Sequence, residues 1–170
     1  MSNFLLSQIL IGIAICTDTL SFQFKERKKI VACLLVSCTL ISVHFMLLGH
    51  WTAAGLGLVA AIRFTTSIFS TSKKLMGLFV VTTIVVSICT YAGLLSILGC
   101  AGGIFGTMAS FCKEDKLLRQ LMLIGTSLWI VHNFLAGSPG AVLMEAIFIS
   151  SNVVGYFRFY IRPKGQPLVP

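Results

Sequence analysis

Charged side chains are scarce in this sequence of 170 residues, and acidic ones are the scarcest. Asp, Glu, Lys and Arg make up 11% of the residues, and five of these residues are acidic. A soluble domain usually has about a quarter of its residues charged. The chain is instead 56% hydrophobic, with a mean hydropathy of +0.96. Short apolar runs separated by brief polar breaks are typical of a polytopic membrane protein and leave no room for a soluble catalytic domain.

Enzyme and metal-site motifs are also missing. No HExxH, GxSxG, P-loop or Rossmann glycine pattern occurs, so we expect no enzymatic activity and no cofactor. The six cysteines lie inside or at the ends of apolar runs, without a CxxC or His/Cys cluster. They therefore indicate small buried side chains rather than disulfides or metal ligands. The net charge of +8 lies in short clusters between apolar runs, which is typical of topology signals and argues against a nucleic-acid partner.

Seven apolar runs are long enough to cross a bilayer, which takes about 20 helical residues. They predict an all-α integral membrane protein with seven transmembrane helices. The predicted helices cover residues 4–24, 30–48, 52–71, 75–92, 94–112, 117–135 and 141–160. The first run has no basic segment before it and no small-x-small cleavage site after it, so we expect a retained helix. Gly93 alone separates the fourth helix from the fifth.

Basic residues decide the number and direction of the helices. With the N-terminus outside and the C-terminus in the cytoplasm, the inner loops and the tail at 161–170, counted with Arg119 and Arg158 at the adjoining helix ends, hold 12 of the 13 basic residues. Merging the fourth and fifth runs would place the last two basic clusters outside, against the positive-inside rule. We therefore predict a single membrane domain over 1–170 with seven helices and the lipid bilayer as its surroundings.

Parts of the chain match at a fixed offset of 88 residues. Residues 43–53 and 131–141 share the pattern Val-His-x-x-Leu-x-Gly. The same offset aligns the charged loops at 25–28 and 113–116. We interpret the chain as two parallel three-helix repeats, at 4–71 and 94–160, joined by the linker helix at 75–92. Repeats of this kind occur in transporters, with the substrate site between them near the midplane. A duplication without transport is the alternative.

Ionisable side chains inside the predicted helices are candidate functional groups, because their burial in a membrane is costly. From the rise per residue, Arg63 lies roughly 16 Å below the outer end of its helix, and Asp18 is at a similar depth. Glu145 lies roughly 6 Å below the outer end of the last helix, level with His132. Two intramembrane ion pairs are therefore predicted: Arg63 with Asp18, and His132 with Glu145. Glu145, about 10 Å higher, is the alternative partner of Arg63.

Polar residues recur at helical spacing on one face of each of the last two predicted helices. These are Trp129, His132 and Asn133 on the sixth helix, and Glu145, Asn152 and Tyr156 on the seventh. If the two faces meet, they form a polar path from the outside to the middle of the membrane. The predicted substrate-binding residues are Arg63, Trp129, His132, Asn133, Glu145 and Asn152. Simple interhelical hydrogen bonding is the alternative.

Four glycines of the fifth predicted helix form two overlapping small-xxx-small pairs: Gly99, Gly102, Gly103 and Gly106. Such pairs let helices approach closely. They predict packing inside the monomer, which we favour, or a homodimer through this helix.

Several stretches resemble the YgjV-type bacterial inner membrane proteins. They are Val43-His44-Phe45, Leu48-Gly49, Ala60-Ala61-Ile62-Arg63, Trp129-Ile130-Val131-His132-Asn133-Phe134-x-Ala136-Gly137-Ser138, Glu145, Asn152 and Arg158-Phe159. The resemblance covers nearly the whole chain and implies a location in the bacterial cytoplasmic membrane. It implies no activity.

The 3+1+3 helix plan is also similar to that of SWEET sugar carriers and PQ-loop proteins. Those relatives have hinge prolines in the first helix of each repeat, and here 4–24 and 94–112 contain none. We therefore weigh two functions. The first is a SWEET-like carrier, passive or proton-coupled, of a small polar solute. The second is a non-transporting accessory or assembly protein of the membrane.

Overall fold

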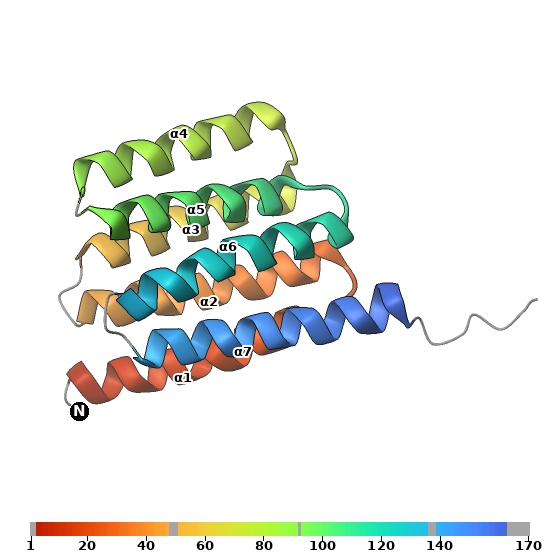
Figure 1. Cartoon of the computed structure of the whole chain (residues 1–170), viewed down its shortest axis with the longest axis horizontal. Coiled ribbons are helices and arrows are strands. Elements are labelled where there is room, and N and C mark those ends of the chain that lie inside the picture. Colours follow the sequence, from red (N-terminus) through yellow and green to blue (C-terminus); the bar gives the residue numbers. More distant parts are fainter. Residues whose placement is uncertain (1–2, 48–50, 92, 136–138, 163–170) are drawn as a thin grey trace, which may run out of the picture.

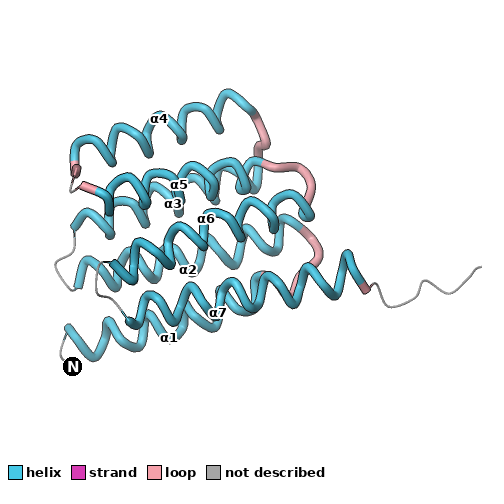
Figure 2. The backbone as a smooth tube through the Cα atoms, in the orientation of Figure 1, coloured by secondary structure: helices cyan, strands magenta, loops and turns pink. Residues whose placement is uncertain are grey.

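The structure is a computed structural model of the chain, and it describes residues 3–47, 51–91, 93–135 and 139–162. These residues form helices and no strand (Figure 2), which confirms the all-α prediction and its seven helices. The helices are α1 (Asn3–Ser21), α2 (Arg27–Leu47), α3 (Trp51–Phe69), α4 (Lys73–Cys89), α5 (Leu94–Phe111), α6 (Asp115–Leu135) and α7 (Pro139–Tyr156). A π-helical turn, η1 (Phe157–Ile161), continues α7.

The break between α4 and α5, which the sequence marks with a single glycine, is confirmed. Thr90 closes the last turn of α4 by donating its backbone N–H to the carbonyl of Val86 at 3.0 Å. Gly93 then has a φ of +74°. This left-handed conformation costs glycine little, because it has no Cβ. The chain can therefore reverse direction over a very short connection.

The helices lie in two layers, with α4 at the edge (Figure 1). We call α1–α3 the first unit and α5–α7 the second unit. The middle helix of each unit packs against its two neighbours, α1 lies against α7, and α3 lies against α5. The first helix of each unit thus contacts the third helix of the other. α1 and α5 also run in the same direction (Figure 1). Two parallel repeats would pack in this way, and the duplication itself stays a prediction.

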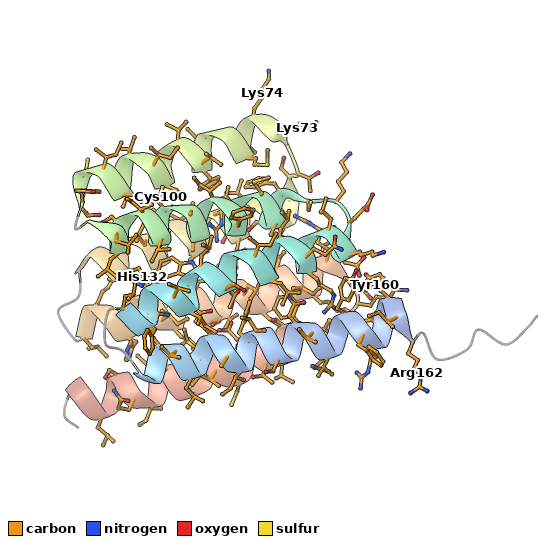
Figure 3. All side chains as sticks on the ribbon, in the orientation of Figure 1. Lys73, Lys74, Cys100, His132, Tyr160 and Arg162 are labelled. Atoms are coloured by element: carbon orange, nitrogen blue, oxygen red, sulfur yellow. The ribbon has the colours of Figure 1, made fainter. Side chains whose placement is uncertain are left out.

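Basic residues gather at the end of the bundle where α2, α4 and α6 begin, which we call the basic end. Figure 3 shows Lys73, Lys74 and Arg162 at this end, and His132 toward the opposite one. The positive-inside rule assigns the basic end to the cytoplasm. The N-out and C-in orientation rests on that rule and stays a prediction.

The apolar core between the units lies toward the basic end. Ile30 and Leu34 come from the first two turns of α2, and Leu118 and Met122 from the first two turns of α6. Phe22, just beyond α1, joins the same buried cluster. Tightly packed apolar side chains therefore fill the space between the units at this end.

Large apolar side chains cover much of the outer surface. On α4, Leu78 and Ile88 expose 59% and 68% of their area. Such a surface suits lipid better than water. Within the described ranges, two segments are long and apolar enough to span a membrane, Leu94–Phe111 and Ala141–Ile161. Leu5–Ser21 and Ala54–Phe69 are apolar but shorter. Seven complete crossings therefore stay a prediction.

Candidate functional site

Arg63 of α3 is buried between the two units, with 7% of its surface exposed. Its Nη1 donates to the Gly103 carbonyl of α5 at 3.2 Å and to the Thr107 hydroxyl at 3.0 Å. Its guanidinium carbon lies 4.7 Å from the ring centre of Phe64. Within the described residues no ion pair joins Arg63 to Asp18. The predicted Asp18–Arg63 pair is not formed, because the guanidinium reaches α5 rather than α1.

Three ionisable side chains, from α1, α3 and α7, lie within electrostatic range of Cys38, near the middle of α2. The thiol lies close enough to Asp18 of α1, Arg63 of α3 and Glu145 of α7 for their charges to act on it. Asp18 and Glu145 are also within electrostatic range of each other. Asp18 is 7% exposed, and its carboxyl group lies near the side chain of Ser37. In the described part of the chain neither carboxylate forms a salt bridge. We call Asp18, Cys38, Arg63 and Glu145 the polar cluster.

Trp129, His132 and Asn133 form a second group, on the last turns of α6. The rings of Trp129 and His132 meet edge to face with centres 5.0 Å apart. The Nδ1 atom of His132 lies 3.0 Å from the side-chain oxygen of Asn133. No ion pair joins His132 to Glu145 among the residues that the structure describes. The predicted pair is not formed, because His132 finds its neighbours on its own helix and on α5.

The four α5 glycines pack inside the chain. Gly99 and Gly102 face Trp129 of α6, Gly103 faces Thr83 of α4, and Gly106 faces Arg63 of α3. A Cβ on Gly102 would lie 2.7 Å from Trp129, and one on Gly103 would lie 2.9 Å from Thr83. Packing within the monomer therefore accounts for this stripe. A homodimer through it stays a prediction.

Arg119 of α6 is fully buried at the basic end. Its Nη1 donates to the Phe22 carbonyl at 3.0 Å, and its Nη2 donates to the Phe24 carbonyl. The side-chain amide of Asn152 donates to the Arg119 carbonyl at 2.9 Å. Asn152 therefore supports Arg119 instead of lining the predicted polar path. The sequence pattern counted Arg119 as a loop charge, although it lies inside the predicted helix 117–135.

Arg27, the first residue of α2, makes a similar contact from the first unit. It donates to the Ser67 carbonyl of α3 at 2.7 Å and to the Ser110 carbonyl of α5. Partial burial lowers the pKa of its guanidinium from the ordinary value, and an arginine in a protein keeps its proton at neutral pH. The Nη2 group of Arg27 therefore joins α3 to α5 by two charged hydrogen bonds.

The contacts of these two arginines are related by the offset of 88 residues. Phe22 and Ser110 are offset partners, and so are Ser67 and Gly155. Arg119 packs directly on Gly155, where an added Cβ would clash with the guanidinium and with the Phe22 carbonyl. Each arginine thus lies between the third helix of its own unit and the first helix of the other. We call the contacts of Arg27 and Arg119 the arginine clasps.

Two of the concavities on the described surface are distinct enough to describe, and the polar cluster lines neither of these two. One, of about 390 Å³, is a groove between α1 and α7 that is lined by Thr19, Gln23, Ser150 and Ser151 and by apolar residues. The other, of about 360 Å³, lies at the basic end. Neither concavity is lined by a predicted substrate-binding residue such as Arg63, Glu145 or Asn152. Over the described residues no three His, Cys, Asp or Glu side chains, those of the polar cluster included, lie close enough together to hold a metal ion.

Comparisons with known proteins point to a single family. Residues 5–163 match the model of a family described as bacterial inner membrane proteins of the YgjV type. The chain is 29% identical over 160 residues to the inner membrane protein YgjV of Escherichia coli strain K12. That match covers 94% of this chain and 87% of the relative. No solved structure matches the chain.

Proposed function

The chain belongs to the YgjV-type family of bacterial inner membrane proteins, and from the ionisable groups between its two units we propose that it is a carrier of a small polar solute. The family match confirms the predicted resemblance and the predicted location in the inner membrane. In this proposal the seven helices form a SWEET-like 3+1+3 carrier, and the solute binds at the polar cluster between the two units. Asn133, Trp129 and His132 lie on the outer route to that site.

The polar cluster is the observation that carries the proposal. Asp18, Cys38, Arg63 and Glu145 come from four helices that belong to both units. Charged groups at membrane depth are rare and costly, and they commonly mark substrate or ion pathways. A purely structural charge would be expected to have an opposite charge beside it. Neither carboxylate forms such a pair within the described residues.

The chemistry of the cluster suits a polar solute whose transport is coupled to protons. Asp18 and Glu145 lie within electrostatic range of each other, and carboxyl groups inside a membrane commonly serve as proton relays in pumps and transporters. Arg63 keeps its charge and has further N–H groups that can donate to a solute oxygen. A solute with hydroxyl or carboxyl oxygens could replace the Thr107 hydroxyl as the acceptor of Arg63.

The basic end of the bundle is closed in this conformation. A carrier that works by alternating access is closed on one side of the membrane at a time. The apolar core fills the space between the units at that end. The arginine clasps join the same ends of the units through charged hydrogen bonds. We propose that both contacts separate when the carrier opens to the cytoplasm.

One observation favours the alternative of a non-transporting accessory protein. Arg63 already has two oxygen acceptors on α5, so it could serve only to hold α3 against α5. Interhelical hydrogen bonds of this kind stabilise membrane proteins without any ligand. The two functions predict different results for solute-driven proton entry. A carrier should lose this proton entry when a carboxyl of the cluster is neutralised, and an accessory protein should have none to lose.

Proton movement in proteoliposomes tests the proposal. The purified chain is reconstituted with a pH-sensitive dye inside, and pools of sugars, amino acids and small carboxylic acids are added outside. We expect one pool to drive proton entry in the wild type. Glu145→Gln should abolish this entry while the protein stays folded. Glu114→Gln, which removes an exposed carboxylate at the basic end, is the matched control and should keep it.

Either of two results would contradict the carrier. Proton entry that survives both Glu145→Gln and Asp18→Asn would remove the cluster from the pathway. Absence of any solute-driven flux, with Glu145→Gln changing only the melting temperature, would favour the accessory function.

A further inference from the structure

The concavity at the basic end is lined mainly by cations, and we call it the basic pocket. Its lining residues are Glu26, Arg27, Lys28, Thr71 and Lys113. They come from the start of α2, the α3–α4 connection and the α5–α6 connection. Its volume of about 360 Å³ lies in the range of roughly 300–1,000 Å³ that is usual for small-ligand sites. Three separate segments therefore build one concave site.

The positive charge of the basic pocket is not balanced from within the protein. Its carboxylate, Glu26, already forms an ion pair with Lys29 at 2.9 Å. Arg27 is held by two carbonyl oxygens, which accept its hydrogen bonds but carry no full charge. In the described structure neither Lys28 nor Lys113 forms an ion pair. The pocket therefore attracts an anion.

The surroundings of the basic pocket favour an anion that carries apolar chains. Phe69, two residues before Thr71, exposes 84% of its area, and Phe24, two residues before Glu26, exposes 38%. Phe69 is the last residue of α3, and Phe24 lies in the connection between α1 and α2 of this inner membrane protein. Basic pockets at the cytoplasmic ends of membrane helices bind anionic lipid headgroups.

We infer that the basic pocket binds the phosphate headgroup of an anionic phospholipid of the cytoplasmic leaflet. The ammonium groups of Lys28 and Lys113 and the hydroxyl of Thr71 are donors for the phosphodiester oxygens. The acyl chains then run along the apolar surface beside Phe69. This site is separate from the polar cluster and does not depend on transport. A bound lipid would connect the first unit to the α5–α6 connection of the second.

Short-chain lipids can test this site on the full-length protein in a detergent with an uncharged headgroup. Binding of short-chain phosphatidylglycerol is measured by native mass spectrometry and by the shift of the melting temperature. Phosphatidylcholine with the same chains tests the charge, and glycerol 3-phosphate tests the need for chains. The double variant Lys28→Gln/Lys113→Gln neutralises the pocket. Lys73→Gln/Lys74→Gln removes the same charge from the same end of the bundle and is the matched control.

We expect phosphatidylglycerol to bind the wild type more tightly than either comparison compound. The pocket variant should lose about 10- to 25-fold in affinity, since each basic residue near a lipid surface contributes about 1 kcal/mol. The control pair should bind as the wild type does. An equal loss in the control pair would show general surface charge and overturn the site. Equal binding of phosphatidylcholine would exclude charge recognition, and equal binding of glycerol 3-phosphate would assign the pocket to free phosphate esters.

Discussion

Replacing Arg119 tests how much the arginine clasps stabilise the bundle. Its guanidinium is fully buried and donates to two carbonyls just beyond α1. A hydrogen bond to a charged group contributes about 1.5–3 kcal/mol. Arg119→Ala removes two such bonds and leaves two carbonyls without their donor. We therefore expect the free energy of unfolding to fall by about 3–6 kcal/mol.

A lysine at this position separates the loss of geometry from the loss of charge. Arg119→Lys keeps the charge but replaces a planar fork by a single ammonium group. We expect it to reach one of the two carbonyls and to lose about half as much stability as Arg119→Ala. A charge effect alone would leave Arg119→Lys close to the wild type.

Unfolding of the purified protein in mixed micelles, followed by circular dichroism, measures both variants. Arg162→Ala is the control, because Arg162 is an exposed cation at the same end of the bundle. An exposed substitution usually changes stability by less than about 0.5 kcal/mol. If Arg119→Ala lost no more stability than Arg162→Ala, the reasoning on the clasps would be refuted.

Three further predictions concern helix approach, the polar cluster and topology. Gly155→Ala should lower the free energy of unfolding by about 1–3 kcal/mol through overpacking. Gly12 has open space around it, so Gly12→Ala should be neutral or slightly stabilising. Equal effects of the two substitutions in a melting assay would contradict the close approach at Gly155. Arg63→Gln should abolish solute-driven proton entry and cost about 1.5–3 kcal/mol of stability, and a flux that persists would remove Arg63 from the site. A cysteine at Leu94 should react with an impermeant thiol reagent from outside intact cells, and one at Lys73 should not; the reverse labelling would invert the topology.

The helices and the likeness to a known family could be predicted because both depend on local pattern. Apolar runs and basic clusters indicate where the chain lies in the bilayer. Gly93 alone is a weak sign of a break between two helices, and the distribution of basic residues is the evidence that the chain reverses direction there. The depth of a residue along a helix could be predicted for the same reason. Arg63, Asp18 and Glu145 were all expected inside the membrane helices, and all three lie within electrostatic range of Cys38.

The partners of these residues could not be predicted, because depth does not fix the rotation of a helix about its axis. Arg63 and Asp18 are at similar depth, yet Arg63 turns toward the glycine-lined face of α5. Hydrogen bonds from arginine side chains to backbone carbonyls could not be predicted for a second reason. Arg119 bonds to carbonyls of Phe22 and Phe24, and a carbonyl has no signature in the side-chain pattern. The position of Cys38 among the ionisable residues was also not predicted, because all six cysteines were interpreted as small buried side chains.

Hydroxyl-radical footprinting of the unmodified protein in lipid nanodiscs tests the central claim most directly, because it labels side chains that meet water. In the proposed carrier, water reaches the polar cluster while lipid covers the outer surface. Cys38 should therefore be oxidised faster than Cys16, although Cys16 is the more exposed of the two in the bundle. Mass spectrometry of the peptides that contain each cysteine gives the two rates. Oxidation of Cys38 no faster than that of Cys16 would mean a dry cluster and would contradict a solute site between the units.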